Sequence, residues 1–429
     1  MAATCPVVGA QEIPDPTTNN PFSRTGVGES APRAFAAQLG MGGVGYGFTD
    51  PHIASPTNPA ALGALRFTSF QVGLGLDRSV LTSGELENVN LDGNLDYLSL
   101  SFPLQNSLQR VLDGKQSKWR NGMQLGIAPF SSIGYDIELV SERPALGSVV
   151  NELQGSGGYY RLQWGNGVEY DGKWRGGVNL SFVFGRTNAL QRITPSADLS
   201  GASVLTDTES FRGRGPEAQF GVQRDLKLSP SEAGVQRVLT IGVTYTVGTT
   251  LNGEGSRFVT TENDFFVIDT VTFRSDLNRS VELPSRIGLG AFYRQSSGLR
   301  IGVDVERIAW SDYRNSVRPD ERLSDATRIA VGGEWIPDVQ AFGRYWQRVR
   351  YRVGGYLTGD ARPGVDAERG VTFGVGLPVV RPREEVSYVN LAVNAGRFGD
   401  EAGISQQYIR LTVGFTLTDN SWFYKRRFN

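Results

Sequence analysis

Apolar and polar residues alternate through most of this 429-residue chain, and a period of two is typical of β-strands. Between residues 408 and 417, one side carries Ile409, Leu411, Val413, Phe415 and Leu417, and the other side carries polar or small residues. No segment sustains the 3.6-residue repeat of an amphipathic helix. We therefore predict an all-β protein. Further segments of this kind lie at 65–76, 93–102, 173–186, 239–248, 285–295, 300–310, 326–336, 348–357, 370–377 and 387–396.

The predicted strands are about ten residues long, which suits a strand that crosses a membrane. Each has one apolar face and one face rich in Gly, Thr and Arg, and glycine accounts for 54 residues. A soluble β-sandwich produces the same alternation with its apolar face turned inward, but open sheets rarely contain so many strands. We predict a transmembrane antiparallel β-barrel of about 14 strands over residues 65–418, with about 16 as the alternative. Its location would be the outer membrane of a Gram-negative cell.

The connections between strands are predicted to differ in length. Asp171-Gly172 and Ser296–Gly298 read as tight turns. Four segments read as long loops, at 187–210, 250–264, 312–325 and 359–369. Outer-membrane barrels combine short periplasmic turns with longer external loops, so this pattern agrees with a barrel only in part.

Composition argues against several classes of function. The chain has one His, His52, and one Cys, Cys5, whereas a zinc site needs three or four such ligands. We therefore expect no catalytic residue, metal site or cofactor, and no enzyme activity. Lys and Arg number 43 against 44 Asp and Glu. A nucleic-acid-binding protein would carry a basic excess.

The two ends of the chain do not read as strands. Residues 1–10 end in Val8-Gly9-Ala10, which is similar to a signal-peptide cleavage site, so we predict the remnant of a signal peptide there. An ordinary disordered terminus is the alternative. Residues 11–64 are rich in Pro, Gly and Asn and form an N-terminal extension. Residues 419–429 form a basic, aromatic C-terminal tail.

Three groups of motifs resemble the FadL-type family of outer-membrane transporters (FadL/TodX-like). A glycine-rich stretch, Gly40–Gly47, leads to Asn58-Pro59-Ala60. Leu283–Arg286 is followed by Tyr293 and by Trp310-Ser311, and Asp325–Ile329 is followed by Gly332–Trp335 and Tyr351–Tyr356. The stretch Asn20–Gly26 also resembles the start of uncharacterised members from Bacteroidetes-type bacteria, although a proline turn explains it equally well.

The resemblance implies that residues 11–64 fold into the lumen as a hatch. Its members would include Gly42, Gly43, Asn58, Pro59 and Ala60. The alternative is that Asn58-Pro59 is a turn into the first strand. The implied function is passage of hydrophobic small molecules, similar to long-chain fatty acids, across the outer membrane. The expected partners are outer-membrane lipid and the hydrophobic small molecule or fatty acid. A second interpretation is a structural or accessory subunit with protein partners in an outer-membrane secretion or assembly complex.

The resemblance also implies an early kinked strand that opens the wall sideways. Here Asn121–Glu138 is strand-like but contains Pro129, with Gly126 and Gly134 on either side. Proline removes one donor from a β-ladder, so in a closed wall it implies a bulge or a gap. We predict a lateral opening at Gly126, Pro129 and Gly134. Two short strands joined by a turn at 129–132 are the alternative.

Three arginines share one face of a strand that would line the lumen: Arg348, Arg350 and Arg352. Buried cations need partners, and Glu334 on a neighbouring strand is the first candidate. Asp304 and Glu306, which are also lumenal by alternation, would complete a charge network. A bound carboxylate ligand is the alternative partner for the arginines.

Overall fold

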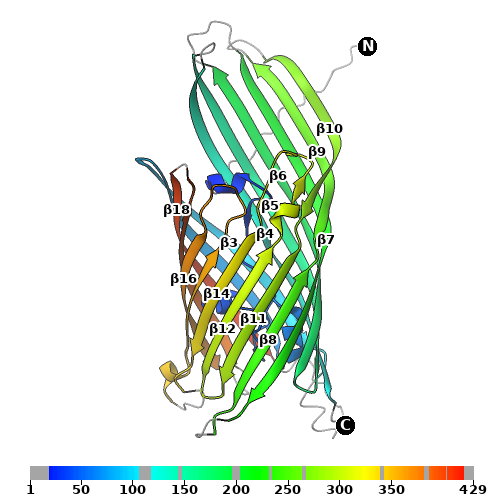
Figure 1. The fold of residues 1–429 in the computed structure, drawn as a ribbon, viewed down its shortest axis with the longest axis vertical. Coiled ribbons are helices and arrows are strands. Elements are labelled where there is room, and N and C mark those ends of the chain that lie inside the picture. Colours follow the sequence, from blue (N-terminus) through cyan, green and yellow to red (C-terminus); the bar gives the residue numbers. More distant parts are fainter. Residues whose placement is uncertain are drawn as a thin grey trace.

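The computed structural model describes residues 19–105, 117–143, 147–195, 203–230, 234–262, 267–338, 343–380, 386–401 and 403–419. Over these residues the protein is a closed antiparallel barrel of 14 strands (Figure 1). The barrel closes where β18 (Ile404–Asp419) pairs with β2 (Thr68–Ser83), from Ile404 opposite Ser83 to Asp419 opposite Thr68. The predicted fold class and strand number are confirmed. Residues 1–18, which include the predicted signal remnant, and 420–429 lie outside the described residues.

Each wall strand pairs with its neighbours in sequence, and two wall positions are each built from two consecutive strands. β8 (Arg237–Thr246) and β9 (Thr249–Glu262) occupy one such position, and β10 (Val267–Leu283) and β11 (Arg286–Gln295) occupy the next. The other wall strands besides β2 and β18 are β3 (Leu86–Pro103), β4 (Trp119–Arg143), β5 (Gly147–Tyr170), β6 (Trp174–Pro195), β7 (Val204–Leu228), β12 (Leu299–Ile308), β14 (Ala326–Trp335), β15 (Arg350–Thr358), β16 (Glu368–Val380) and β17 (Val386–Gly399).

The helices of the described chain are short, and none is long and apolar enough to cross a membrane. They are α1 (Ala36–Leu39) and the 3-10 helices η1 (Pro21–Arg24), η2 (Pro59–Ala64), η3 (Trp310–Asp312) and η4 (Tyr345–Gln347). Two short strands, β1 (Glu29–Ser30) and β13 (Arg314–Asn315), add to the edges of β4 and β10.

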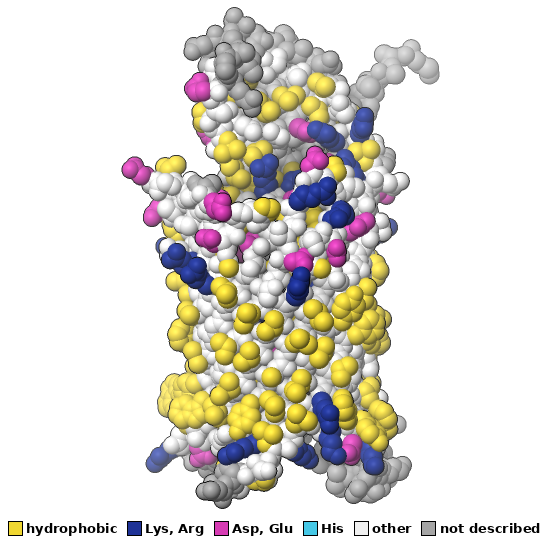
Figure 2. Space-filling model, viewed as in Figure 1, with side chains coloured by type: hydrophobic (Ala, Val, Ile, Leu, Met, Phe, Trp, Pro, Cys, Tyr) yellow, Lys and Arg dark blue, Asp and Glu magenta, His cyan; other side chains and the backbone are white. Residues whose placement is uncertain are grey.

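An apolar belt covers the face of the barrel that Figure 2 shows, and exposed large apolar residues occur on wall strands from β2 to β18. Pairing aligns side chains from successive strands into rows, and the members of one such row are 39–51% exposed. Charged side chains gather above the belt and at its lower rim (Figure 2). A wide ring of exposed aliphatic residues is unfavourable in water but matches the hydrocarbon core of a bilayer. The row consists of Val222, Val243, Leu289, Val305, Ile329 and Leu357.

Six strands continue well above the rest of the wall and form a curved sheet at one end of the molecule (Figure 1). We call this sheet the wing: residues 134–143 of β4, 147–156 of β5, 187–195 of β6, 204–210 of β7, 255–262 of β9 and 267–279 of β10.

The wing corrects two predicted loops. The described parts of 187–210 and 250–264 are the ends of β6 and β7 and strand β9. The prediction was wrong because it depended on an apolar face. Outside a bilayer a strand needs no such face, and β-branched residues such as Thr206 and Thr208 favour a strand without one. The predicted loop at 312–325 contains the short strand β13 and is otherwise irregular, and the predicted loop at 359–369 is irregular up to the start of β16.

The described N-terminal segment, from Asn19 to Phe67, runs through the barrel before β2 begins. Its apolar side chains are enclosed by the wall: Met41, Val44 and Phe48 are at most 1% exposed and pack with Phe292 of β11 and Ala330 of β14. We use the name hatch for residues 31–67 to describe their place inside the barrel; the functional hatch predicted for residues 11–64 stays a prediction. The barrel therefore encloses a packed interior, built from chain that precedes it in sequence.

Replacing a belt residue by arginine tests whether the belt lies in lipid. We expect Leu289→Arg to lower the free energy of unfolding in lipid vesicles by about 2–4 kcal/mol, because its charge would enter the hydrocarbon. The matched control is Phe273→Arg in the wing, where the side chain is similarly exposed, at 59% against 50% for Leu289. Phe273 pairs with Phe258 of β9, which pairs with Thr208 of β7. Thr208 lies about 45 Å along β7 from Val222, which belongs to the belt. The free energy of unfolding of both variants is measured by urea titration. Equal losses of stability would contradict the placement of the belt in lipid.

Candidate functional site

The hatch approaches the wall so closely that parts of the wall facing it must be glycine. A Cβ added at Gly332 would lie 2.1 Å from the Met41 carbonyl oxygen, and one at Gly242 would lie 1.9 Å from that of Tyr46. On the hatch side, Gly42 and Gly43 have φ angles of +69° and +78°. Side chains other than glycine rarely adopt that conformation. These glycines therefore set the path of the chain through the lumen.

Asn58, Pro59 and Ala60 lie at the start of η2, which packs against β5, β6 and β7. The Asn58 side chain is fully buried and has two roles. Its Oδ1 accepts a hydrogen bond from the Ala60 amide at 3.0 Å, and its Nδ2 donates to the Tyr46 carbonyl at 2.8 Å. The motif caps a helix and ties together two parts of the hatch. The chain leaves η2 at Ala64 and enters β2 at Thr68.

A buried ionic group, which we call the Asp50 cluster, joins the hatch to three wall strands. The Oδ2 atom of Asp50 lies 2.8 Å from Nη1 of Arg300 on β12 and 2.8 Å from Nη1 of Arg350 on β15. Glu334 on β14 lies 3.2 Å from Arg300, 3.7 Å from Arg350 and 2.7 Å from Nε of Arg352. Charges this far from water are costly unless they are paired. The cluster therefore holds the hatch and the wall in one arrangement.

The structure brings together only some of the residues predicted for the charge network. Arg350, Arg352 and Glu334 belong to the Asp50 cluster, whereas Arg348 follows η4 before β15 begins and has no ion pair in the described chain. Asp304 instead accepts hydrogen bonds from the amides of Gly45 and Tyr46, at 2.6 and 3.0 Å.

Glu306 forms no ion pair among the described residues and lines a cavity of about 290 Å³ between the hatch and the wall. Sequence reasoning missed Asp50 and Arg300. Arg300 could have been found from its lumenal parity on a strand next to Glu334. Asp50 stands in irregular chain and carried no such signal.

A second ionic group, which we call the Glu217 cluster, holds the other side of the hatch. Glu217 of β7 lies 2.7 Å from Arg33 of the hatch, 3.0 Å from Arg161 of β5 and 4.0 Å from Arg286 of β11. The guanidinium groups of Arg161 and Arg286 lie 4.8 and 5.8 Å from the centre of the Phe130 ring. Aromatic rings stabilise cations in this position. The hatch is therefore paired with the wall on two sides.

The wall parts between β3 and β4. These strands pair only from Leu98–Ile127 to Pro103–Gly122, whereas β2 pairs with β3 from Ser69 to Ser83. β4 itself continues as one strand with a bulge between Pro129 and Ser131, so it is not two strands joined by a turn. Above the bulge its free edge pairs with β1, Glu29 lying opposite Ser132. We call the separation of the two strands the β3–β4 gap.

Two of the three residues predicted at a lateral opening line a small cavity at this gap. Gly126 and Pro129 belong to its wall, together with Phe35, Leu98 and Ala128, and its volume is about 40 Å³. Gly134 lies higher, where its amide donates to Ser23 Oγ and its carbonyl accepts from the Asn20 amide. The gap begins level with Tyr160 and Phe184 at the upper part of the apolar belt.

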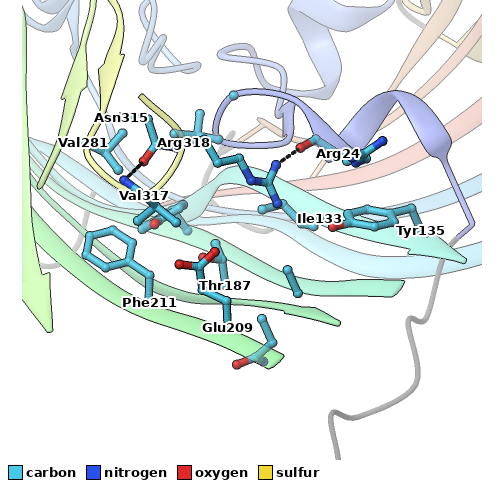
Figure 3. A pocket seen from close by; sticks show the side chains of 15 residues that line it. Arg24, Ile133, Tyr135, Thr187, Glu209, Phe211, Val281, Asn315, Val317 and Arg318 are labelled. Carbon is cyan, nitrogen blue, oxygen red and sulfur yellow. Dashed lines mark hydrogen bonds between the residues drawn. The ribbon is translucent and has the colours of Figure 1, made fainter. Parts of the chain in front are cut away.

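A third cavity, of about 50 Å³, lies at the base of the wing (Figure 3). Phe211, Tyr135 and Val281 give it apolar walls, and Arg318 crosses it to donate a hydrogen bond to the Arg24 carbonyl at 2.5 Å. No cluster of three or more His, Cys, Asp or Glu residues suited to a metal ion occurs in the described segments.

Comparison with known proteins identifies the family of this chain. The family model named BamG matches residues 1–429. The chain belongs to the BamG family. No curated protein is similar to it in sequence.

Solved structures show that this BamG-family barrel has the fold of the FadL-type channels. The Pseudomonas putida toluene transporter TodX is similar with a TM-score of 0.58 and 15% identity, over 91% of this chain and 99% of TodX. The Ralstonia pickettii toluene transporter TbuX has a TM-score of 0.56 and 14% identity, over 91% of this chain and 98% of TbuX. A Pseudomonas aeruginosa FadL homologue has a TM-score of 0.56 and 12% identity, over 91% of this chain and 99% of the homologue. The predicted resemblance and outer-membrane location are confirmed. The Bacteroidetes-type assignment stays a prediction.

Neutralising Asp50 tests whether the Asp50 cluster holds the hatch. We expect Asp50→Asn to loosen the hatch, because it leaves Arg300 and Arg350 with Glu334 alone, and breaking a buried pair costs about 3–5 kcal/mol. The readout is maleimide labelling of Val44→Cys, a position that is fully buried in the lumen. Both variants are made in a Cys5→Ser background so that the chain carries one thiol. We expect labelling at least tenfold faster than with Asp50 intact.

The matched control is Asp325→Asn, which removes a carboxylate that is also paired with arginine but lies near the surface. A hydrogen bond from Arg307 at 2.8 Å, supported by Ser311, lowers the pKa of Asp325 to about 2. Asp325 is therefore charged at neutral pH, and its pair with Arg307 does not touch the hatch. We expect no change in the labelling rate. Equal labelling rates for the two variants would contradict the role of the Asp50 cluster in holding the hatch.

Proposed function

We propose that this barrel passes hydrophobic small molecules, of the long-chain fatty-acid type, across the outer membrane, and that they leave the lumen through the β3–β4 gap. The observation that carries the proposal is that the pairing of β3 with β4 stops at Leu98 and Ile127, so that the wall parts at the upper part of the apolar belt. An apolar molecule that moves sideways there enters lipid without crossing the polar, charged end of the barrel. The partners would be the ligand and the lipid of the outer membrane.

The lining of the gap suits such a molecule. Phe35 of the hatch stacks on Tyr97 of β3 with ring centres 4.1 Å apart, and Ala128 of β4 packs against this pair. Leu98 and Ile127 close the lower end of the gap. In this proposal the hatch is the movable part, because residues 31–67 fill the lumen beside the gap. Gly42 and Gly43 would allow its turn, and the Asn58-Pro59-Ala60 cap would hold its lower part against the wall.

Filling the gap tests the proposed route. We expect Ala128→Trp to reduce uptake of a fluorescent long-chain fatty acid by cells at least fivefold, because the indole would occupy the small cavity between Phe35 and Pro129. The matched control is Ala291→Trp on β11, which adds the same side chain to a part of the wall with continuous pairing on both sides. Folding of both variants is checked by their resistance to unfolding in detergent. Unchanged uptake by a folded Ala128→Trp barrel would exclude the gap as the route.

A second candidate is an accessory subunit of an outer-membrane secretion or assembly complex. Two observations favour it: the wing adds a large sheet that no step through the lumen uses, and the two ionic clusters tie the hatch firmly to the wall. Outer-membrane barrels place tight turns toward the periplasm and longer extensions outside. The turn at Asp171-Gly172 lies at the end opposite the wing, so the wing would face the cell exterior.

Native mass spectrometry of protein purified gently from its own membrane separates the two candidates. A co-purified fatty acid or similar amphiphile that is lost when Asn58 and Pro59 are replaced would support passage of small molecules. A barrel without such a molecule, arriving with stoichiometric protein partners, would support the accessory subunit.

A further inference from the structure

Unlike the barrel below it, the wing is an open sheet among the described residues, with two edges that pair with no further wall strand. One is the upper part of β10, which pairs with β9 on one side and meets β13 only at Val281 and Glu282. The other is the upper part of β4, which pairs with β5 on one side. A free edge exposes unpaired amide and carbonyl groups and can accept a further strand. The two edges differ in how well they are protected.

The β10 edge is irregular and the β4 edge is regular. β10 pairs with β9 through three register shifts, between Val267 and Asp269, Thr270 and Thr272, and Arg274 and Leu277. Bulges of this kind are a usual protection against edge pairing. On β4, every residue from Gly134 to Arg143 pairs in unbroken register with β5. The β4 edge is therefore the one that offers a straight template.

Hydrogen bonds to the N-terminal segment show which β4 residues face this edge. The Gly134 amide donates to Ser23 Oγ at 3.0 Å and its carbonyl accepts from the Asn20 amide at 2.7 Å. The Asp136 amide donates to Asn19 Oδ1 at 3.0 Å. In an antiparallel strand, alternate residues direct both backbone groups to the same side. Glu138, Val140 and Glu142 therefore point their amides and carbonyls at the same edge.

These three residues have no hydrogen-bond partner on that edge within the described segments of the chain. Lower down, the same edge already carries added chain: β1 pairs with Ser131 and Ser132, and Asn19 and Asn20 bond to Gly134 and Asp136. Asn19, the first described residue, bonds to Asp136, two residues before Glu138. The open stretch continues a strand-addition surface that the protein itself uses.

The side chains at this edge define the chemistry of its occupant. Asp136, Glu138 and Glu142 are exposed on the outer face, and Glu138 lies directly opposite Glu152 of β5. Like charges directly opposite one another are unfavourable. A nearby cation, Arg192, has its Nη1 atom 3.7 Å from Oε2 of Glu152. On the inner face Leu139 is 48% exposed although it is apolar. The edge is acidic outside and apolar inside.

We propose that the β4 edge, residues 137–143, binds an extended segment of another protein by adding it as a further strand. The segment alternates basic residues, which face Glu138, Glu142 and Glu152, with apolar residues that cover Leu139. Backbone hydrogen bonds to Glu138, Val140 and Glu142 supply affinity, and the alternation supplies specificity. This interaction is separate from the passage of small molecules, since it involves neither the hatch nor the β3–β4 gap.

A substitution that removes one edge donor tests the proposal. Because the Val140 amide points away from β5, Val140→Pro removes a donor from the free edge and leaves the β4–β5 ladder intact. The matched control, Val140→Ala, shortens the side chain and keeps the amide. The probe is the fluorescent peptide Lys-Val-Lys-Val-Lys-Val-Lys, added to the full-length barrel in detergent. We expect its affinity to fall about tenfold with Val140→Pro and to be unchanged with Val140→Ala.

Two further measurements separate strand addition from charge attraction and self-association. The same peptide with alternate backbone amides methylated should lose binding, because it keeps every charge but cannot form the ladder. The substitution Glu138→Lys should weaken the binding of the unmethylated peptide at low salt. Equal affinities of Val140→Pro and Val140→Ala, binding of the methylated peptide, or no peptide binding at all would overturn the proposal. A photo-crosslinker placed at Val140 in living cells should join a different protein, through a segment of this alternating type. A product of twice the chain's mass would instead assign the edge to a second copy of the chain.

Discussion

The need to pair every backbone amide and carbonyl of the wall governs this structure. In hydrocarbon an unpaired peptide group costs several kcal/mol, so strands that cross a membrane must close into a barrel. Fourteen strands satisfy the condition by pairing β18 with β2. β4 shows how the condition changes along a single strand. It pairs with β3 at its lower end, with the N-terminal segment in the middle, and only with β5 in the wing.

The lumen follows a second condition, which is the cost of burying charge. The Asp50 and Glu217 clusters each contain more arginines than carboxylates, and each links the hatch to strands on a different side of the barrel. Removing one partner of such a group leaves other charges unpaired away from water. The hatch is consequently held by electrostatics as well as by the close contacts that wall glycines such as Gly332 and Gly242 permit.

The gap and the wing give the molecule two separate regions of interest. The gap begins at the upper part of the apolar belt, and in the proposed function it is the route of apolar molecules from lumen to lipid. The wing lies beyond the belt (Figure 2), and its β4 edge carries acidic side chains and backbone groups that lipid cannot satisfy. Their chemistry differs, so the proposed route for small molecules and the proposed strand addition would use separate parts of the molecule.

The all-β class, the membrane barrel, the approximate strand number and the bulge-forming proline follow from the amino-acid sequence alone. These features are local, because a period of two and a proline within it can be read over about ten residues. Alternation also placed Arg350, Arg352 and Glu334 on the lumenal side. Which charges meet depends on the three-dimensional fold. Asp50 lies 250 residues from Arg300 and 300 from Arg350 in irregular chain, and no periodicity relates them. The wing was missed for the opposite reason, because strands outside the bilayer need no apolar face. Which edges stay unpaired depends on where neighbouring strands end, and the register of the whole sheet sets that property.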